Sequence, residues 1–137
     1  MRLLGKEPVD LRVLAVIAAG GAAGALTRFA VDGLLPASPG AFPWATFGVN
    51  VAGCALIGVL MVVVTEVAVR PHRLARPFLG VGVLGGFTTF STYAVQAHGL
   101  LTAGATATAA AYLAGTAVAA VAATWAGMRV TRALARR

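Results

Sequence analysis

The feature that most constrains this chain is a long stretch without charge. From Pro77 to Met128 no Asp, Glu, Lys or Arg occurs in 52 residues. A soluble protein carries about a quarter charged residues, whereas this chain of 137 residues carries 11%. A helix of about 20 apolar residues crosses the hydrocarbon core of a bilayer, which is about 30 Å thick. The stretch is therefore long enough for two spans, and the chain is predicted to be a polytopic membrane protein.

Apolar runs predict four transmembrane helices, over about 13–35, 44–69, 78–101 and 103–128. The first run ends at the proline-rich segment PASPGAFP, which helices avoid, and the second ends at RPHRLARP. Strands are not expected, because the runs are long, rich in Ala and Gly, and lack alternation of period 2. The predicted fold is an all-α integral membrane protein with a single four-helix domain over residues 1–137.

The basic residues predict the orientation of the spans. Ten of the eleven Lys and Arg residues lie in three segments that four spans would place on one side of the membrane, and the two opposite loops contain none. Because Lys and Arg in short loops favour the cytoplasm, both termini are expected on the cytoplasmic side of the cell (inner or plasma) membrane. Nucleic-acid binding is not expected, because the basic residues cluster at span ends and form no groove. The ten residues are Arg2, Lys6, Arg12, Arg70, Arg73, Arg76, Arg129, Arg132, Arg136 and Arg137.

Polar side chains inside the apolar runs are the candidate functional residues, since a polar group in lipid is expensive and tends to face protein or water. Thr46, Asn50 and Gly53 share one face of the second span. The Asn50 amide either makes an interhelical hydrogen bond or directs its N–H donors at an anion. In the fourth span, the hydroxyls of Tyr112 and Thr116 either bond to carbonyls of their own helix or line a path.

The third span contains LGGFTTFSTY at residues 84–93, where glycines and threonines predict a broken helix. A break at membrane depth frees backbone carbonyls that must find partners, and transporters use such carbonyls to bind cations. The glycines therefore either form a main-chain cation site or act as a hinge surrounded by aromatic packing. After the break, Phe90 and Tyr93 share one face beside Ser91 and Thr92. The positive edge of an aromatic ring can face an anion without holding it as tightly as a cationic side chain.

The remaining polar residues indicate no enzyme. Arg28 and Asp32, four residues apart in the first span, either pair with each other or mark a vestibule that attracts anions. The sequence has no acid pair in the apolar runs, no Cys/His cluster and no phosphate-binding loop in a strand-to-helix setting, so no catalytic set is expected. A selective path must then be lined by amides, hydroxyls and ring edges, which bind weakly enough to release an ion.

Three motifs together resemble the CrcB/Fluc family of fluoride-specific ion channels: GGAAGALTRF at 20–29, TFGVNVAG at 46–53 and GGFTTFSTY at 85–93. The resemblance implies a fluoride-selective passive channel that exports cytoplasmic fluoride and reduces its toxicity. It also implies an antiparallel dimer with a structural Na⁺ at its centre. The implied Na⁺ ligands are the backbone carbonyls of Gly85 and Thr88. The implied fluoride pathway consists of Asn50, Phe90, Tyr93, Ser91, Thr92, Tyr112 and Thr116, with Arg28 at the vestibule.

Two features depart from the family's pattern. Position 93 is Tyr where the family commonly has Phe, which adds a hydroxyl to that ring. The basic residues favour one orientation strongly, whereas an antiparallel homodimer needs one sequence to insert both ways. We therefore expect the second subunit to be either this chain or a homologous partner of reversed bias.

Two other classes of membrane protein fit the sequence less well. A small multidrug exporter would need a carboxylate in the middle of the first span, and a membrane scaffold would leave Asn50 without a purpose.

Overall fold

The computed structural model describes residues 10–136, and this part of the chain contains helices and no strand. Four of its helical rods are long and apolar enough to cross a membrane, which confirms the predicted all-α class with four spans. Arg2, Lys6 and Arg137, which belong to the segments expected on the cytoplasmic side, lie outside the described residues. The elements are α1 (Leu11–Leu34), α2 (Trp44–Val62), the π-helical segments η1 (Val63–Val67) and η2 (Arg76–Leu84), α3 (Gly85–Phe87), α4 (Ser91–Thr102) and α5 (Thr106–Ala135).

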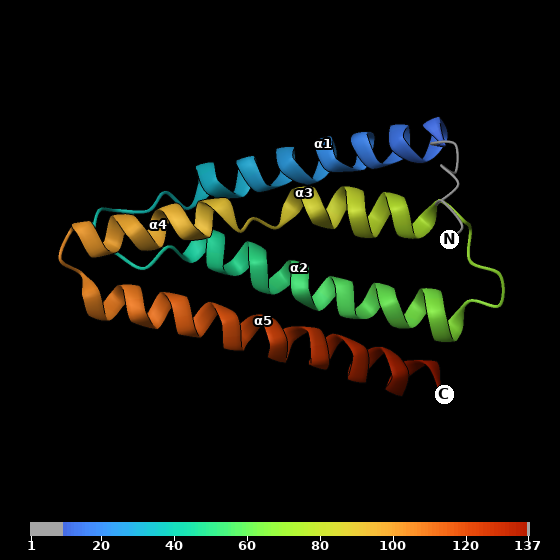
Figure 1. Ribbon diagram of the computed structural model, residues 1–137. Helices are drawn as coiled ribbons and strands as arrows, with labels where there is room; N and C mark the ends of the chain where they lie inside the picture. The colour runs from blue at the N-terminus through green and yellow to red at the C-terminus, as the bar shows by residue number, and fades with distance from the viewer. Residues whose placement is uncertain (1–9, 137) are drawn as a thin grey trace, which may run out of the picture.

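The rods lie side by side in an elongated bundle (Figure 1). The third rod (Arg76–Thr102) consists of η2, α3 and α4, and its η2 and α3 segments pack against α1. Helix α2 lies between this rod and α5, and α2 contacts α5 extensively. The start of α1, the loop between η1 and η2, and the end of α5 lie at the same end of the bundle. This arrangement agrees with the side assigned to the three basic segments.

The ends of the helices follow from local chemistry. Asp10 caps α1 by accepting hydrogen bonds from the backbone N–H groups of Arg12 and Val13, as N-cap aspartates do. Gly104 adopts a φ of 76° in the turn between α4 and α5, a conformation that side chains disfavour. The last helix continues to Ala135, past the end predicted at Met128, because arginines mark the edge of the membrane but do not end a helix.

Glycines allow α1 to lie directly on the third rod. A Cβ added at Gly20 would stand 2.6 Å from the carbonyl oxygen of Phe78, and one at Gly24 would overlap the carbonyl of Val83. A Cβ on Gly86 would in turn overlap the carbonyl of Gly21. Gly20 with Gly24, and Gly82 with Gly86, form G-x-x-x-G spacings that bring two backbones of one chain together, as small residues do in membrane proteins.

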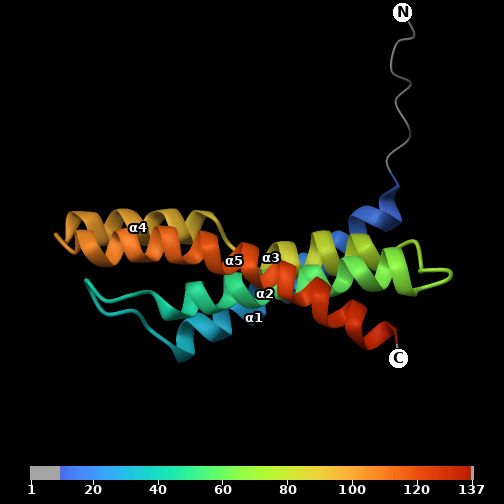
Figure 2. The same cartoon turned by 90° about the horizontal axis from the view of Figure 1, so that it is seen from below.

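The third rod is interrupted where the glycine and threonine pairs meet. The helix α3 ends at Phe87, Thr88 is extended with ψ of 159°, and α4 begins at Ser91. Figure 2 shows the connection between α3 and α4 next to the middle of α5. On the outer side of the interruption, α4 and the first half of α5 run beside each other. The interruption thus lies near mid-bundle, within reach of α2 and α5.

Candidate functional site

Asn50 binds the interrupted backbone from the neighbouring rod. Its Oδ1 accepts the Thr89 N–H at 2.9 Å, and its Nδ2 donates to the Thr89 carbonyl at 3.0 Å. The backbone N–H can only donate, so the orientation of the amide is fixed by this pair of bonds. One Nδ2 hydrogen satisfies Thr89, and the amide carries a second. Asn50 is only 8% exposed, so this second donor has few alternatives to a bound ligand.

Two backbone carbonyls of the third rod lack the donors that a continuous helix would give them. In a continuous helix, the Thr89 N–H would donate to the Gly85 carbonyl, and the Thr92 N–H to the Thr88 carbonyl. Here the Thr89 N–H bonds to Asn50, and the Thr92 N–H bonds to the Thr89 Oγ1 at 3.2 Å. The helical donors of Gly85 and Thr88 are therefore directed elsewhere, and both carbonyls can accept from another source.

Thr89 connects the interruption to the start of α4. Its Oγ1 lies 3.0 Å from the hydroxyl of Thr92 and 3.3 Å from that of Ser91. Sequence reasoning placed Ser91 and Thr92 on the ion path but did not assign Thr89 a role. In the structure the Thr89 hydroxyl bonds to each of the other two, and its Oγ1 also accepts the Thr92 N–H, so Thr89 supplies a side-chain acceptor to the first turn of α4.

A cavity of about 340 Å³ lies beside the interruption, and no charged side chain lines it. Its wall comes from α2, from the interruption and from α5, so residues far apart in sequence meet there. Four of the predicted pathway residues line it, together with the predicted Na⁺ ligand Thr88. Its lining is Asn50, Cys54, Thr88, Thr89, Phe90, Tyr93, Thr116, Ala117 and Ala120.

Two aromatic rings, Phe90 and Tyr93, line this cavity. The ring centroids of Phe90 and Tyr93 lie 5.8 Å apart, and those of Tyr93 and Tyr112 lie 5.1 Å apart. The Tyr93 hydroxyl donates to the Leu113 carbonyl at 2.9 Å, which fixes that ring against α5. Phe90 is 80% exposed, so its ring also faces the surroundings of the described chain.

Tyr112 lies next to the cavity and not in its wall. It is fully buried in a cluster with Ala97, Leu100 and Ala109, and its hydroxyl donates to Gln96 Oε1 at 2.9 Å. Among the described residues Tyr112 is therefore a packed core residue. Its ring lies next to the ring of Tyr93, which lines the cavity.

Two threonines of α5 illustrate the two roles that the sequence left open, which are bonding to a carbonyl of the same helix and lining a path. Thr124 donates to the Ala120 carbonyl of its own helix at 3.0 Å. Thr116 is 6% exposed, lines the cavity, and has a hydroxyl without a hydrogen-bond partner among the described residues. A buried hydroxyl without a partner costs free energy. Thr116 is therefore the α5 hydroxyl that is available to a ligand.

Arg28 contacts the interruption and makes no ion pair with Asp32 within residues 10–136. Its Nε lies 3.4 Å from the carbonyl oxygen of Gly86 and donates to it. The structure therefore does not support the interpretation that Arg28 pairs with Asp32. The guanidinium instead brings positive charge to the backbone beside the released carbonyls.

The site also includes residues that sequence reasoning missed. Thr89 supplies both backbone groups that Asn50 binds, and Cys54 lies one turn after Asn50 in the cavity wall. Cys54 shares the helical face of Asn50 because it follows by four residues, and this spacing could have identified it. No spacing could have identified Thr89, because its role depends on contact with another rod.

Comparison with known proteins places this arrangement in a family. The family model described as "CrcB-like protein, Camphor Resistance (CrcB)" matches residues 15–128, which include every candidate residue above. The chain belongs to the CrcB family. A CrcB relative from Streptomyces coelicolor, named "Fluoride-specific ion channel FluC 1", is 59% identical over 114 residues, covering 82% of this chain and 73% of that protein. "Fluoride-specific ion channel FluC 2" from Nocardia farcinica is 56% identical over 115 residues, covering 84% of this chain and 81% of that protein.

More distant members of the CrcB family carry the same kind of name. "Fluoride-specific ion channel FluC 1" from Mycobacterium bovis is 43% identical over 104 residues, covering 75% of this chain and 77% of that protein. Membership and four apolar rods identify the chain as a multi-pass membrane protein. The last turns of α5, which carry Arg129, Arg132 and Arg136, lie beyond the segment that the CrcB model matches.

Proposed function

We propose that this protein is a fluoride-selective passive anion channel that lets cytoplasmic fluoride leave the cell and so lowers its toxicity. The observation that carries the proposal is the similarity to proteins named fluoride-specific ion channels, at 59% and 56% identity over most of the chain. The uncharged cavity supports it, because a channel must bind its ion weakly enough to release it. The proposal includes no enzymatic step.

Neutral donors would replace the water around fluoride in the cavity. The second Nδ2 hydrogen of Asn50 and the unpartnered hydroxyl of Thr116 would donate to the anion. The positive edge of the Phe90 ring, and of Tyr93 beside it, would face the anion. Ser91, Thr92 and Tyr112 would extend the polar surface toward either end. No carboxylate, histidine or basic side chain lines the cavity, so transport would follow the electrochemical gradient of fluoride without proton coupling.

We further propose that the carbonyls of Gly85 and Thr88 hold a structural Na⁺ that is not transported. The fit rests on the hydrogen bonds that free these carbonyls from their helical donors. Within residues 10–136 no group of three His, Cys, Asp or Glu side chains could hold a metal, so neutral carbonyls are the suitable ligands for a hard cation. A bound Na⁺ would supply positive charge that ties the two carbonyls together.

The second pair of Na⁺ ligands would come from another subunit in antiparallel orientation. The asymmetry of the ten basic residues would keep this chain in one orientation, with both termini in the cytoplasm. We therefore propose a CrcB/Fluc partner of reversed charge bias, with a homodimer as the alternative. The two cases differ in whether this chain alone yields conducting dimers.

The test is ion efflux from liposomes that contain either the chain alone or the chain with a candidate partner. We expect rapid fluoride efflux and no comparable chloride efflux. Asn50→Asp keeps the acceptor for the Thr89 N–H but replaces the amide donors by negative charge, so it should abolish fluoride efflux. Thr65→Val is the control, because the Thr65 hydroxyl bonds to the Met61 carbonyl of its own helix. Equal fluxes of fluoride and chloride would contradict the proposal.

A further inference from the structure

The end of α5 carries a basic cluster that the proposed channel does not use. Arg129, Arg132 and Arg136 lie on one face of the helix, separated by three and four residues. With Ala133 they line a surface hollow of about 480 Å³. The cluster lies beyond the segment that the CrcB family model matches.

The cluster lies at the depth of lipid headgroups. About 20 helical residues cross the hydrocarbon core, so a helix that begins at Thr106 has crossed it near Trp125. At 1.5 Å per residue, Arg129 lies about 6 Å and Arg136 about 16 Å farther along the axis. Because helical side chains tilt toward the N-terminus of their helix, these arginines reach back toward the membrane.

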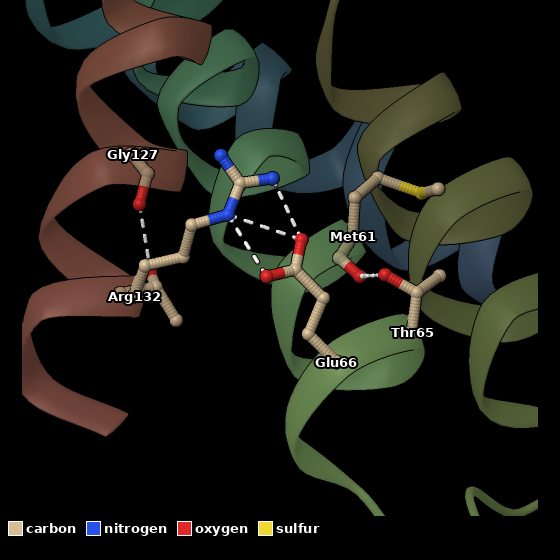
Figure 3. A network of polar contacts seen from close by, with 6 residues as sticks. Met61, Thr65, Glu66, Gly127 and Arg132 are labelled. Carbon is tan, nitrogen blue, oxygen red and sulfur yellow. Dashed lines mark hydrogen bonds and ion pairs between the residues drawn. The ribbon is translucent and has the colours of Figure 1, made fainter. Parts of the chain in front are cut away.

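The charge of Arg132 is already neutralised by an ion pair with Glu66. Its Nε donates to both carboxylate oxygens of Glu66, at 2.9 and 3.1 Å, and its Nη2 lies 2.6 Å from Glu66 Oε1 (Figure 3). Glu66 belongs to η1, so this ion pair ties the end of the second rod to α5 and fixes one side of the hollow. The Arg132 charge is therefore not the one that attracts a further anion.

Arg129 and Arg136 make no ion pair within residues 10–136, although the Glu66 carboxylate that pairs with Arg132 also lies in the field of Arg136. The other ion pair in this part of the chain joins Asp10 to Arg73, and Asp32 lies near the opposite end of α1. The Arg129 guanidinium stacks over the Trp125 ring, 5.0 Å from its centroid. Trp residues prefer the membrane interface, so this contact holds the Arg129 charge at the boundary between acyl chains and headgroups.

We propose that Arg129 and Arg136 bind the phosphate of an anionic phospholipid in the cytoplasmic leaflet. Arginine binds phosphate oxygens with two parallel hydrogen bonds, and two guanidiniums about two turns apart can contact one headgroup from both sides. The Trp125 ring would pack against the upper acyl chains of the same lipid. Each arginine near an anionic surface contributes about 1 kcal/mol, which corresponds to roughly a five-fold preference per residue.

Quenching of tryptophan fluorescence by brominated lipids tests the proposal, because the chain has two tryptophans, Trp44 and Trp125. They lie at opposite ends of the bundle and are 65% and 57% exposed. In a Trp44→Phe protein, brominated phosphatidylglycerol should quench Trp125 at least five-fold more effectively than brominated phosphatidylcholine at the same mole fraction. In a Trp125→Phe protein, Trp44 should show a ratio near one.

Arginine variants in the Trp44→Phe background make the test specific. The ratio of quenching by phosphatidylglycerol to quenching by phosphatidylcholine should fall to about one in the double variant Arg129→Gln/Arg136→Gln. It should fall part of the way in Arg136→Gln, which leaves the Arg129 stack in place. Arg12→Gln/Arg76→Gln removes equal charge from α1 and η2, on the far side of α2 (Figure 1), and should keep the ratio. Unchanged quenching by phosphatidylcholine reports an intact fold. Equal ratios at Trp125 and Trp44, or loss of the ratio on adding inorganic phosphate, would overturn the proposal.

Discussion

Asn50 serves both roles that its position in a membrane span allows. Its carboxamide makes an interhelical pair of hydrogen bonds with Thr89, and it retains one further N–H beside the cavity. The bond that stabilises the bundle therefore also aims the donor. This explains how a flexible side chain holds a fixed direction at the site that we propose binds fluoride.

Thr116→Val separates a ligand-binding role from a structural one. Valine has a similar shape and removes a buried hydroxyl that has no partner in this subunit. We expect unchanged or slightly higher thermal stability, since an unsatisfied group disappears. If Thr116 donates to fluoride, efflux should fall about ten-fold, because hydrogen bonds to charged groups contribute about 1.5 kcal/mol or more. Thr124→Val should leave efflux unchanged, and a stable Thr116→Val protein with normal efflux would exclude the role.

Tyr93→Phe tests the hydroxyl that this chain adds to the aromatic pair. The change removes the bond to the Leu113 carbonyl and keeps the ring. A membrane-buried hydrogen bond contributes about 0.6 kcal/mol, so thermal unfolding should shift slightly downward while fluoride-selective efflux persists. Tyr93→Ala removes the ring as well and should reduce efflux. Loss of fluoride selectivity in Tyr93→Phe would show that the hydroxyl, and not the ring, makes the essential contact.

At the scale of elements, the interruption of the third rod depends on its neighbours. Gly86 lies against Gly21 of α1, and Asn50 of α2 binds Thr89 on the other side. The N–H and carbonyl of Thr89 are thus satisfied by protein at a depth where lipid offers no hydrogen bonds, whereas the Gly85 and Thr88 carbonyls have lost their helical donors. The polar composition of residues 84–93 predicted unusual backbone in this segment, but the partners of that backbone come from contacts between rods.

Gly24→Ala tests the close contact between α1 and the third rod. A methyl group at this position would overlap the Val83 carbonyl and lie 2.7 Å from the Phe87 backbone nitrogen. Overpacking of this kind costs about 1–3 kcal/mol, so the thermal midpoint in detergent should fall clearly. Gly33→Ala is the matched control on the same helix, because no atom lies within 4 Å of its added methyl group. Equal midpoints for the two variants would show that the contact contributes little.

For the whole molecule, charge predicts how the bundle sits in the membrane. The start of α1, the loop before η2 and the end of α5 share one end of the bundle (Figure 1) and carry every basic residue of the described part except Arg28. The two opposite turns carry none. A single orientation is therefore expected, and this bears directly on the identity of the second subunit.

A reporter fused to the C-terminus tests this orientation. We expect the reporter on the cytoplasmic side only, as judged by paired reporters that are active on one side of the membrane. Comparable populations on both sides would refute the fixed orientation and remove the need for a partner of reversed bias. Conducting dimers from the purified chain alone would lead to the same conclusion.

The sequence was most informative where one residue determines the outcome and least where contacts do. Spans follow from apolar length, and Asn50 and Thr116 were identifiable because polar groups are rare in lipid. The cap formed by Thr89, the contact of Arg28 with Gly86 and the burial of Tyr112 depend on the order of the rods, which hydropathy does not contain. Helix α5 continues past the predicted end of the span near Met128, because charge reports the membrane edge and not the helix end.

The most direct test of the central claim is the reversal potential of the channel in a planar bilayer. Fluoride is placed in unequal concentrations on the two sides, and chloride balances the total anion. If a neutral site beside the interrupted rod selects fluoride, current should reverse at the equilibrium potential of fluoride and vanish when chloride alone is present. A reversal potential near zero under the fluoride gradient would contradict the account.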